Sequence, residues 1–353
     1  MSSNRLGNID ALRAFAALAV FVQHGFMDVM ARGEGGSFAG FAGRTLETLD
    51  TGRLGVVIFF LISGFVVPYS IKPDRPVLRF AVSRLFRLYP AYWVSLVLVS
   101  VALTLSGQAP SPEQLLANGT MAATILGEDW MSGVYWTLFI EMLFYGAIIV
   151  LFVLGLLYRP LIVAGLGGLL ALTSVAPILA PDLPLPVQYI GLHLSVLFSG
   201  LLLRLGLLEG KRMALVLAAL LFVVQMGCVA VAADYALQTE RGFAAFSMMS
   251  TLLAYGLGFA LFLAGATLVR ADTRFMAHLA AISYSLYLLH SVVNQAVFEI
   301  MPLSGGWTDL AALAVSLALT IGLASLVYRW VEQPCMALGR HLLARPRARL
   351  AAA

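Results

Sequence analysis

Long apolar segments separated by short polar ones run through the whole chain, and they constrain its fold more than any other feature. A helix needs about 20 predominantly apolar residues to cross the hydrocarbon core of a membrane. Segments of this kind occur about ten times, at residues 11–30, 54–71, 88–106, 134–157, 160–180, 186–206, 212–233, 243–268, 278–300 and 308–330. With only 11% charged residues, a soluble domain of this length is excluded. We therefore predict an all-α polytopic membrane protein with about ten transmembrane helices.

The basic residues indicate how these helices are oriented, because Lys and Arg gather in cytoplasmic loops. The clusters that follow alternate segments all fall on one side: Lys72, Arg75, Arg79, Arg84 and Arg87; Arg159; Arg204, Lys211 and Arg212; Arg270 and Arg274; Arg340, Arg345, Arg347 and Arg349. The other side receives fewer, namely Arg32, Arg44, Arg53 and Arg241. We expect both termini to face the cytoplasm. The net charge of +4 follows from this asymmetry and requires no nucleic-acid partner.

The chain is expected to form one membrane domain over residues 1–335, followed by a basic cytoplasmic tail over 336–353. Its two cysteines, Cys228 and Cys335, fall at opposite sides of the predicted membrane, too far apart for a disulfide. The sequence contains neither a P-loop nor an H-E-x-x-H motif, and no Cys/His spacing typical of a metal site. We predict no bound metal and no tightly bound cofactor.

The first apolar segment carries two ionisable residues, Arg13 and His24. Such groups are costly within a bilayer, and each is a candidate for function. Eleven residues separate them, which places them on one face of a helix and about 16 Å apart along its axis. Arg13 would then lie at the cytoplasmic edge and His24 toward the outer leaflet. Alternatively, Arg13 extends to the interface and His24 only hydrogen-bonds a neighbouring helix.

Glu141 is the second candidate, within the segment "VYWTLFIEMLFY" of residues 134–145. It lies about 10 Å from the outer end of its helix, at a depth similar to that of His24. A histidine and a carboxylate at one level could form a general base and its orienting partner. They could equally form a structural ion pair, or Glu141 could bind substrate alone.

Arg84 and Arg87 lie within "RFAVSRLFRLYPAYW" of residues 79–93, just before the third segment. At a spacing of three they are neighbours on a helix. Paired guanidinium groups suit phosphate recognition. The alternative is a topology signal or a contact with anionic lipids.

Hydroxyl groups mark the cytoplasmic half of the ninth segment and the middle of the second. "ISYSLYLLH" carries Ser283, Tyr284, Ser285, Tyr287 and His290, and "FFLISGF" carries Ser63 beside Gly64. Such faces usually hold transmembrane helices together, although they can also line a narrow polar tunnel.

Taken together these segments resemble the acyltransferase-3 family of integral membrane acyltransferases. The resemblance covers nearly the whole chain and rests on "IDALRAFAALAVFVQHG", "GVVIFFLISGF", "SRLFRLYPAYW", "WTLFIEMLFY", "ISYSLYLLH" and "YRWVEQP". It implies acyl-CoA as a cytoplasmic donor, with acetyl-CoA as the first candidate. It also implies a glycan or lipid-linked saccharide as acceptor, with a macrolide-like metabolite as the alternative. It also implies essential roles for Arg13, His24, Arg84 and Arg87, and a multi-pass location among the lipids of a bacterial inner membrane.

On this basis we expect catalysis by His24, Glu141 and Arg13. The donor would contact Arg84, Arg87, Arg13, Ser63, Tyr284, Tyr287 and His290, and the acceptor would contact Trp136 and Glu141. Direct attack of the acceptor hydroxyl on the thioester and a covalent acyl-histidine both remain open. A transporter of a small anionic or sugar substrate is the main alternative, because charged residues in the membrane are natural there too. The sequence leaves the oligomeric state open.

Overall fold

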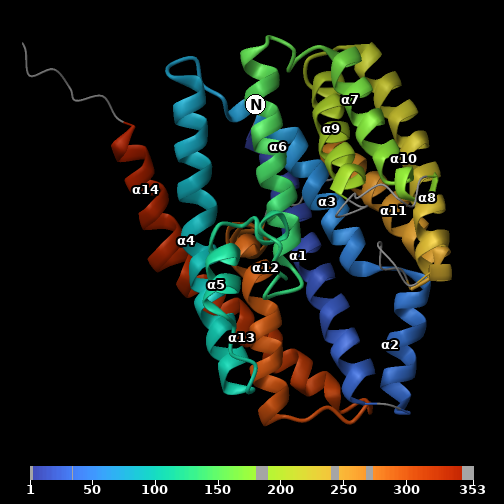
Figure 1. Ribbon diagram of the computed structural model, residues 1–353, viewed down its shortest axis with the longest axis vertical. Helices are drawn as coiled ribbons and strands as arrows, with labels where there is room; N and C mark the ends of the chain where they lie inside the picture. The colour runs from blue at the N-terminus through green and yellow to red at the C-terminus, as the bar shows by residue number, and fades with distance from the viewer. Residues whose placement is uncertain (1–2, 34, 180–189, 240–245, 268–272, 344–353) are drawn as a thin grey trace, which may run out of the picture.

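A computed structural model describes residues 3–33, 35–179, 190–239, 246–267 and 273–343, and within these ranges it contains helices but no strand. Nine helices in the described ranges are long and apolar enough to cross a membrane. They are α1 (Ser3–Arg32), α3 (Thr51–Val66), α4 (Pro76–Leu105), α6 (Tyr135–Val153), α9 (Ile190–Leu207), α10 (Arg212–Thr239), α11 (Met248–Thr267), α12 (Arg274–Ile300) and α13 (Asp309–Val327). The prediction of an all-α polytopic membrane protein is confirmed (Figure 1).

Shorter helices complete the described fold. They are α2 (Ser37–Thr48), α5 (Pro112–Gly119), α7 (Pro160–Thr173), α8 (Ala176–Leu179) and α14 (Gln333–Leu342), with short turns at Val67–Ser70, Ala123–Leu126 and Tyr328–Glu332. Helix α7 is the fifth predicted segment. Its 14 residues span about 21 Å, less than the hydrocarbon thickness of about 30 Å. It packs instead along α9 and α10.

The third predicted segment starts earlier than expected, since α4 begins at Pro76 rather than near residue 88. Proline is favoured in the first helical turn, where its missing N–H costs nothing. The added turns carry Arg79, Arg84 and Arg87 as a helical extension of the membrane segment. This extension places the arginine pair on a rigid helix rather than in a loop.

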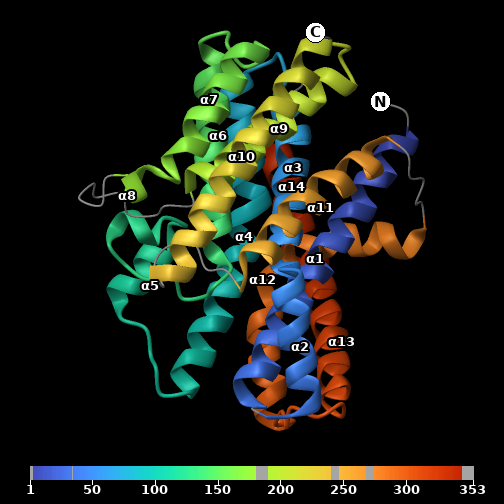
Figure 2. The same ribbon diagram turned by 90° about the vertical axis from the view of Figure 1, so that its right-hand side faces the viewer.

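The connections alternate between two ends of the molecule, as the basic residues predicted. The start of α1 and the α3–α4, α6–α7 and α9–α10 connections lie at the upper end in both Figure 1 and Figure 2, whereas the α1–α2 and α12–α13 connections lie at the lower end. We call the upper end the basic end, because Lys72, Arg75, Arg159 and Lys211 lie in its connections and Arg212 begins α10 there. Arg241, Arg270, Arg345, Arg347 and Arg349 lie outside the described residues, as does the tail from 344 onward. That the basic end faces the cytoplasm stays a prediction.

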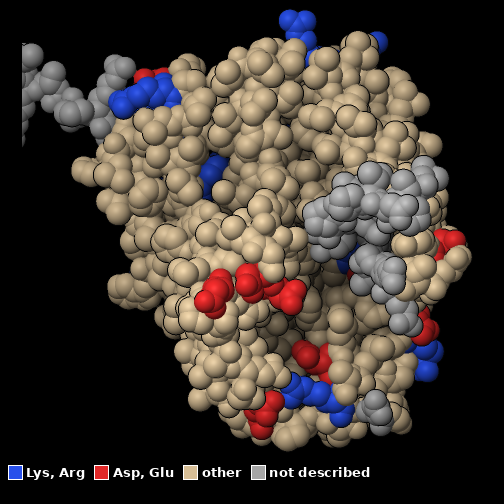
Figure 3. Space-filling view, in the orientation of Figure 1, with Lys and Arg blue, Asp and Glu red and all other residues tan. Residues whose placement is uncertain are grey.

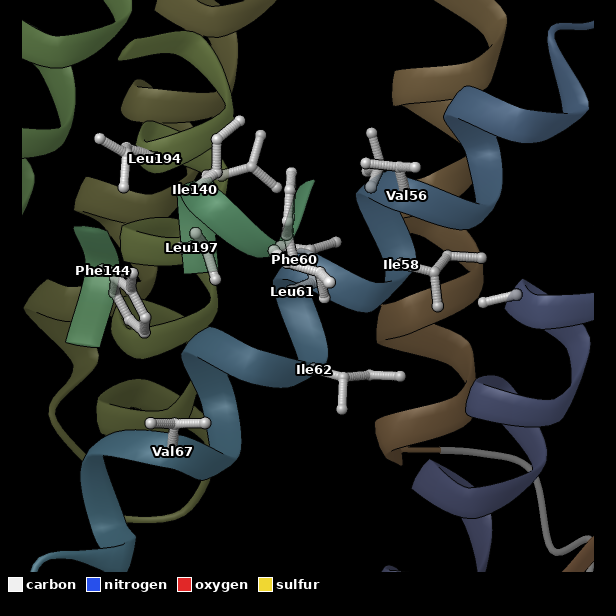
Figure 4. Packing of buried hydrophobic residues seen from close by; sticks show 14 of the residues in the cluster. Val56, Ile58, Phe60, Leu61, Ile62, Val67, Ile140, Phe144, Leu194 and Leu197 are labelled. Carbon is white, nitrogen blue, oxygen red and sulfur yellow. The ribbon is translucent and has the colours of Figure 1, made fainter. Parts of the chain in front are cut away.

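Helices α3 and α9 cross at the centre of the fold, where two glycines let their backbones approach closely. A Cβ atom on Gly200 would lie 3.0 Å from the Cα atom of Gly64, and one on Gly64 would collide with the carbonyl group of Leu197. Around this crossing, Phe60 and Leu61 of α3 pack with Leu197 of α9 and with apolar residues of α6 (Figure 4). Small residues at such crossings allow the close packing on which membrane helices rely.

Replacing Gly64 by alanine is therefore expected to destabilise the protein by about 1–3 kcal/mol, because the added methyl group meets backbone that cannot move aside. The measurement is the apparent melting temperature in detergent. Gly146→Ala in α6 is the matched control, since a Cβ atom there meets open space and alanine favours the helix. Equal melting temperatures for the two variants would contradict the close crossing.

Candidate active site

A cavity of about 130 Å³ lies between α1, α3, α4, α6 and α12. Its polar lining consists of Arg13, Ser63, Arg84, Arg87, Thr137, Glu141, Tyr145, Ser283, Tyr284 and Tyr287. Apolar residues such as Phe59, Phe60 and Leu88 complete the wall. In Figure 3, basic side-chain atoms lie inside a recess of the upper half of the molecule, between α4 and α6. The structure thus brings together residues from five helices that the sequence singled out separately.

Helix α4 supplies the basic wall of this cavity. A hydrogen bond of 3.1 Å from Nη2 to the Ser70 hydroxyl holds the guanidinium of Arg84, which also lies 5.7 Å from the centre of the Tyr145 ring. Arg87 lies 3.8 Å from a carboxylate oxygen of Glu332. Arg13 joins them from α1 and lies 3.5 Å from Asp10. Because a guanidinium carries five N–H donors, these partners fix each group while leaving donors for an anion.

Helix α6 supplies the polar wall opposite, through residues spaced by four. Thr137, Glu141 and Tyr145 therefore lie on one face, one turn apart. One oxygen of Glu141 accepts hydrogen bonds from the Tyr145 hydroxyl at 2.5 Å and from the Ser63 hydroxyl at 3.1 Å. The carboxylate is thus held in place at the cavity wall.

Two tyrosines of α12 close the cavity and connect its helices. Tyr284 donates to the carbonyl of Leu88 in α4 at 2.8 Å. The Tyr287 hydroxyl lies 2.7 Å from the Thr137 hydroxyl and 3.1 Å from the carbonyl of Val134. These bonds give both residues a structural role in addition to their place in the lining.

His24 does not line this cavity. Its ring faces the ring of His290 in α12, with 5.0 Å between ring centres. Glu141 instead bonds Ser63 and Tyr145, so the predicted pairing of His24 with Glu141 is not what the structure shows. The prediction compared depths along two helices, but equal depth says nothing of the lateral distance between them. His24 faces α12, whereas Glu141 faces α3 and the cavity.

Trp136 also lies outside the cavity lining. Its ring lies 5.0 Å from the ring of His193 in α9. Phe60 and Tyr255 contact the same histidine, which is buried. Trp136 and Glu141 therefore face different surroundings, although both were expected to contact the acceptor.

Glu332 is the site-related residue that the sequence analysis left without a role. It is fully buried, accepts a hydrogen bond from Ser285 and lies opposite Arg87. It ends a π-helical turn, Tyr328–Glu332, that joins α13 to α14. Such turns are rare and frequently mark functional sites. One feature of the sequence could have indicated Glu332: it is a carboxylate directly after a predicted membrane segment, within "YRWVEQP".

The architecture and the cavity together define the class of the protein: a polytopic membrane protein whose buried polar site, rich in guanidinium groups, opens within its helical core. The particular family follows from comparison with known proteins. Residues 6–329 match the acyltransferase-3 family, described as an acyltransferase domain, and the chain belongs to this family. The resemblance seen in the sequence is confirmed.

Individual relatives are distant. The chain is 25% identical to the acyltransferase MdmB of Streptomyces mycarofaciens, over 95% of this chain and 92% of the relative. It is 28% identical to the exopolysaccharide production protein ExoZ of Rhizobium meliloti, over 85% of this chain and 94% of the relative. A shorter match, 30% identical over 41% of this chain and 43% of the relative, is to nodulation protein 10 of Rhizobium leguminosarum bv. viciae. No solved structure matches the chain significantly.

Proposed function

We propose that the protein transfers an acyl group, with acetyl as the first candidate, from cytoplasmic acyl-CoA to a hydroxyl of a surface or lipid-linked glycan. Membership in the acyltransferase-3 family supports acyl transfer. The name of ExoZ, an exopolysaccharide production protein, supports a glycan as acceptor. The bacterial origin of the relatives supports a location in the inner membrane of a bacterium.

The observation that carries the choice of donor is the cavity with Arg13, Arg84 and Arg87 in its lining. Coenzyme A bears several phosphate charges, and guanidinium groups bind phosphate with paired, charge-assisted hydrogen bonds. The arginines of α4 lie toward the basic end, where a cytoplasmic donor would enter. In this proposal they hold the phosphates, and the arm that bears the thioester passes beside Tyr284 and Tyr287.

The chemical step places His24 as the general base. Its imidazole removes the proton of the acceptor hydroxyl as the oxygen attacks the thioester carbonyl. The carbon–sulfur bond then breaks, and the imidazolium returns the proton to the leaving thiolate, which gives free CoA and an O-acyl glycan. General-base assistance of this kind is worth about 10²–10⁴-fold in rate. Glu141, held by Ser63 and Tyr145, would bind the donor within the cavity rather than orient His24.

The proposal is tested with membrane vesicles of both orientations, formed in the presence of neutral oligosaccharides so that both faces meet the acceptor, and then supplied with acetyl-CoA from outside. We expect free CoA to appear with inside-out vesicles, whose cytoplasmic face is accessible, and with right-side-out vesicles only after detergent is added. Vesicles with the variant Arg84→Ala/Arg87→Ala serve as the control and should release little CoA. Uptake of intact acetyl-CoA into the vesicles would instead identify a transporter. The proposal is refuted if no free CoA is released and calorimetry detects no binding of any short-chain acyl-CoA.

A further inference from the structure

His290 lies at the centre of the contact between α1 and α12, and one of its nitrogens has no partner. The residue is fully buried. Its Nδ1 lies 2.8 Å from the carbonyl oxygen of Tyr287, one turn earlier in α12. A carbonyl oxygen only accepts hydrogen bonds, so Nδ1 carries the proton and Nε2 carries the lone pair. In the described part of the chain no atom donates to Nε2.

A buried acceptor without a donor is unfavourable, which points to a donor close by. The imidazole of His24 is the neighbouring polar group, with ring centres 5.0 Å apart and ring planes inclined by 54°. The terminal torsion of a histidine side chain is soft, so a rotation of the His24 ring can direct its N–H group at Nε2.

The register of the two helices keeps these rings opposite one another. One turn beyond them, the Asn294 side chain of α12 donates to the Asp28 carboxylate of α1 at 3.3 Å. Ser316 of α13 donates to the same asparagine at 2.5 Å, which fixes its amide. Residues 24 and 28 of α1 thus face residues 290 and 294 of α12. Neither helix can slide or rotate without breaking both contacts.

We propose that His290 is the positioning residue of His24: its Nε2 accepts a hydrogen bond from the N–H of the neutral His24 ring and thereby directs the other nitrogen of His24, which carries the lone pair, at the acceptor hydroxyl. The inference rests on the proposed acyl transfer and gives His290 a role other than contact with the donor. When His24 takes the acceptor's proton, the positive ring keeps its hydrogen bond to Nε2. The proton then passes to the CoA thiolate, and both rings return to their neutral forms.

The test compares two amide replacements that each preserve one nitrogen position. In His290→Gln the amide reaches the position of Nε2 and can still accept from His24. In His290→Asn the amide reaches only the position of Nδ1 and can still donate to the Tyr287 carbonyl. We expect His290→Asn to lower kcat for acetyl-CoA turnover about 10- to 100-fold with KM unchanged, and His290→Gln to lower it less than about tenfold. His278→Gln, which replaces an exposed histidine outside the pair, serves as the control.

A purely structural His290 predicts the reverse order, because only His290→Asn keeps the bond to Tyr287. Equal turnover of both variants and the wild type would also overturn the proposal. A second readout needs no turnover: in ¹⁵N-histidine-labelled protein, the Nε2 resonance of His290 should move when His24 is replaced by Phe. An unchanged resonance would overturn the inference. Absence of CoA release by the wild type, with the resonance moving as expected, would refute the proposed function and leave the histidine pair intact.

Discussion

Replacement of His24 by glutamine is expected to lower the rate of acyl transfer by at least about 10²-fold, because it removes the group that takes the acceptor proton in the proposed mechanism. The affinity for acyl-CoA should be unchanged, since His24 does not line the cavity that contains Arg13, Arg84 and Arg87. Both quantities are measured on one detergent preparation, turnover by release of free CoA and affinity by calorimetry.

Stability measured on the same preparation separates this role from a structural one. A histidine that only packs against His290 predicts a lower melting temperature and a modest loss of turnover in the protein that remains folded. His278→Gln, on an exposed part of α12, is the matched control and should behave as the wild type. A stable His24→Gln protein that binds acyl-CoA and acylates at nearly the normal rate would remove His24 from the mechanism.

Replacement of Arg84 or Arg87 by alanine is expected to weaken acyl-CoA binding about 10- to 100-fold, through the loss of charge-assisted hydrogen bonds to phosphate. Arg87→Lys keeps the charge but not the planar fork, and should fall between alanine and the wild type. Calorimetry at two salt concentrations measures the effect, which should shrink as salt screens the charges.

Arg79→Ala is the matched control, because Arg79 lies on the same helix but pairs with Asp74 at 2.6 Å and does not line the cavity. Arg87→Ala also removes the guanidinium that faces the buried carboxylate of Glu332, and a buried charge without its partner can destabilise the fold. The double variant Arg87→Ala/Glu332→Gln removes that buried charge and isolates the effect on binding. If both single alanine variants bind acyl-CoA like the wild type, the two arginines act only as a signal that orients the helices in the membrane.

The membrane helices could be predicted because hydrocarbon-spanning length is visible in composition alone. Their ends could not. Helix α4 extends to Pro76 through a segment whose arginines lower its hydropathy, and α7 ends at Thr173, before the predicted end of its segment at residue 180. Helix ends depend on local signals, such as Pro76 in the first turn of α4, and not on how apolar the segment is.

The candidate site could likewise be predicted only in part. Helical spacing predicted that Arg84 and Arg87 act together, and both line the cavity. It could not show that Glu141 bonds Ser63 and Tyr145 rather than His24, because rotation about a helix axis does not fix which helix lies opposite. Nor could it place Glu332, because the π-helical turn before it departs from the period of 3.6 residues on which such reasoning depends.

If the donor binds at the cavity as proposed, the continuous helix α1 sets a minimum length for the donor molecule. Arg13 lies in the cavity wall, while His24 faces α12 three turns further along the same rigid helix, about 16 Å away. A thioester anchored by its phosphates near Arg13 reaches His24 only if its carrier has an arm of comparable length. Short synthetic thioesters without the nucleotide would lack both the anchor and the reach. Selection among thioesters would thus begin with the size of the carrier, before the acyl group itself is recognised.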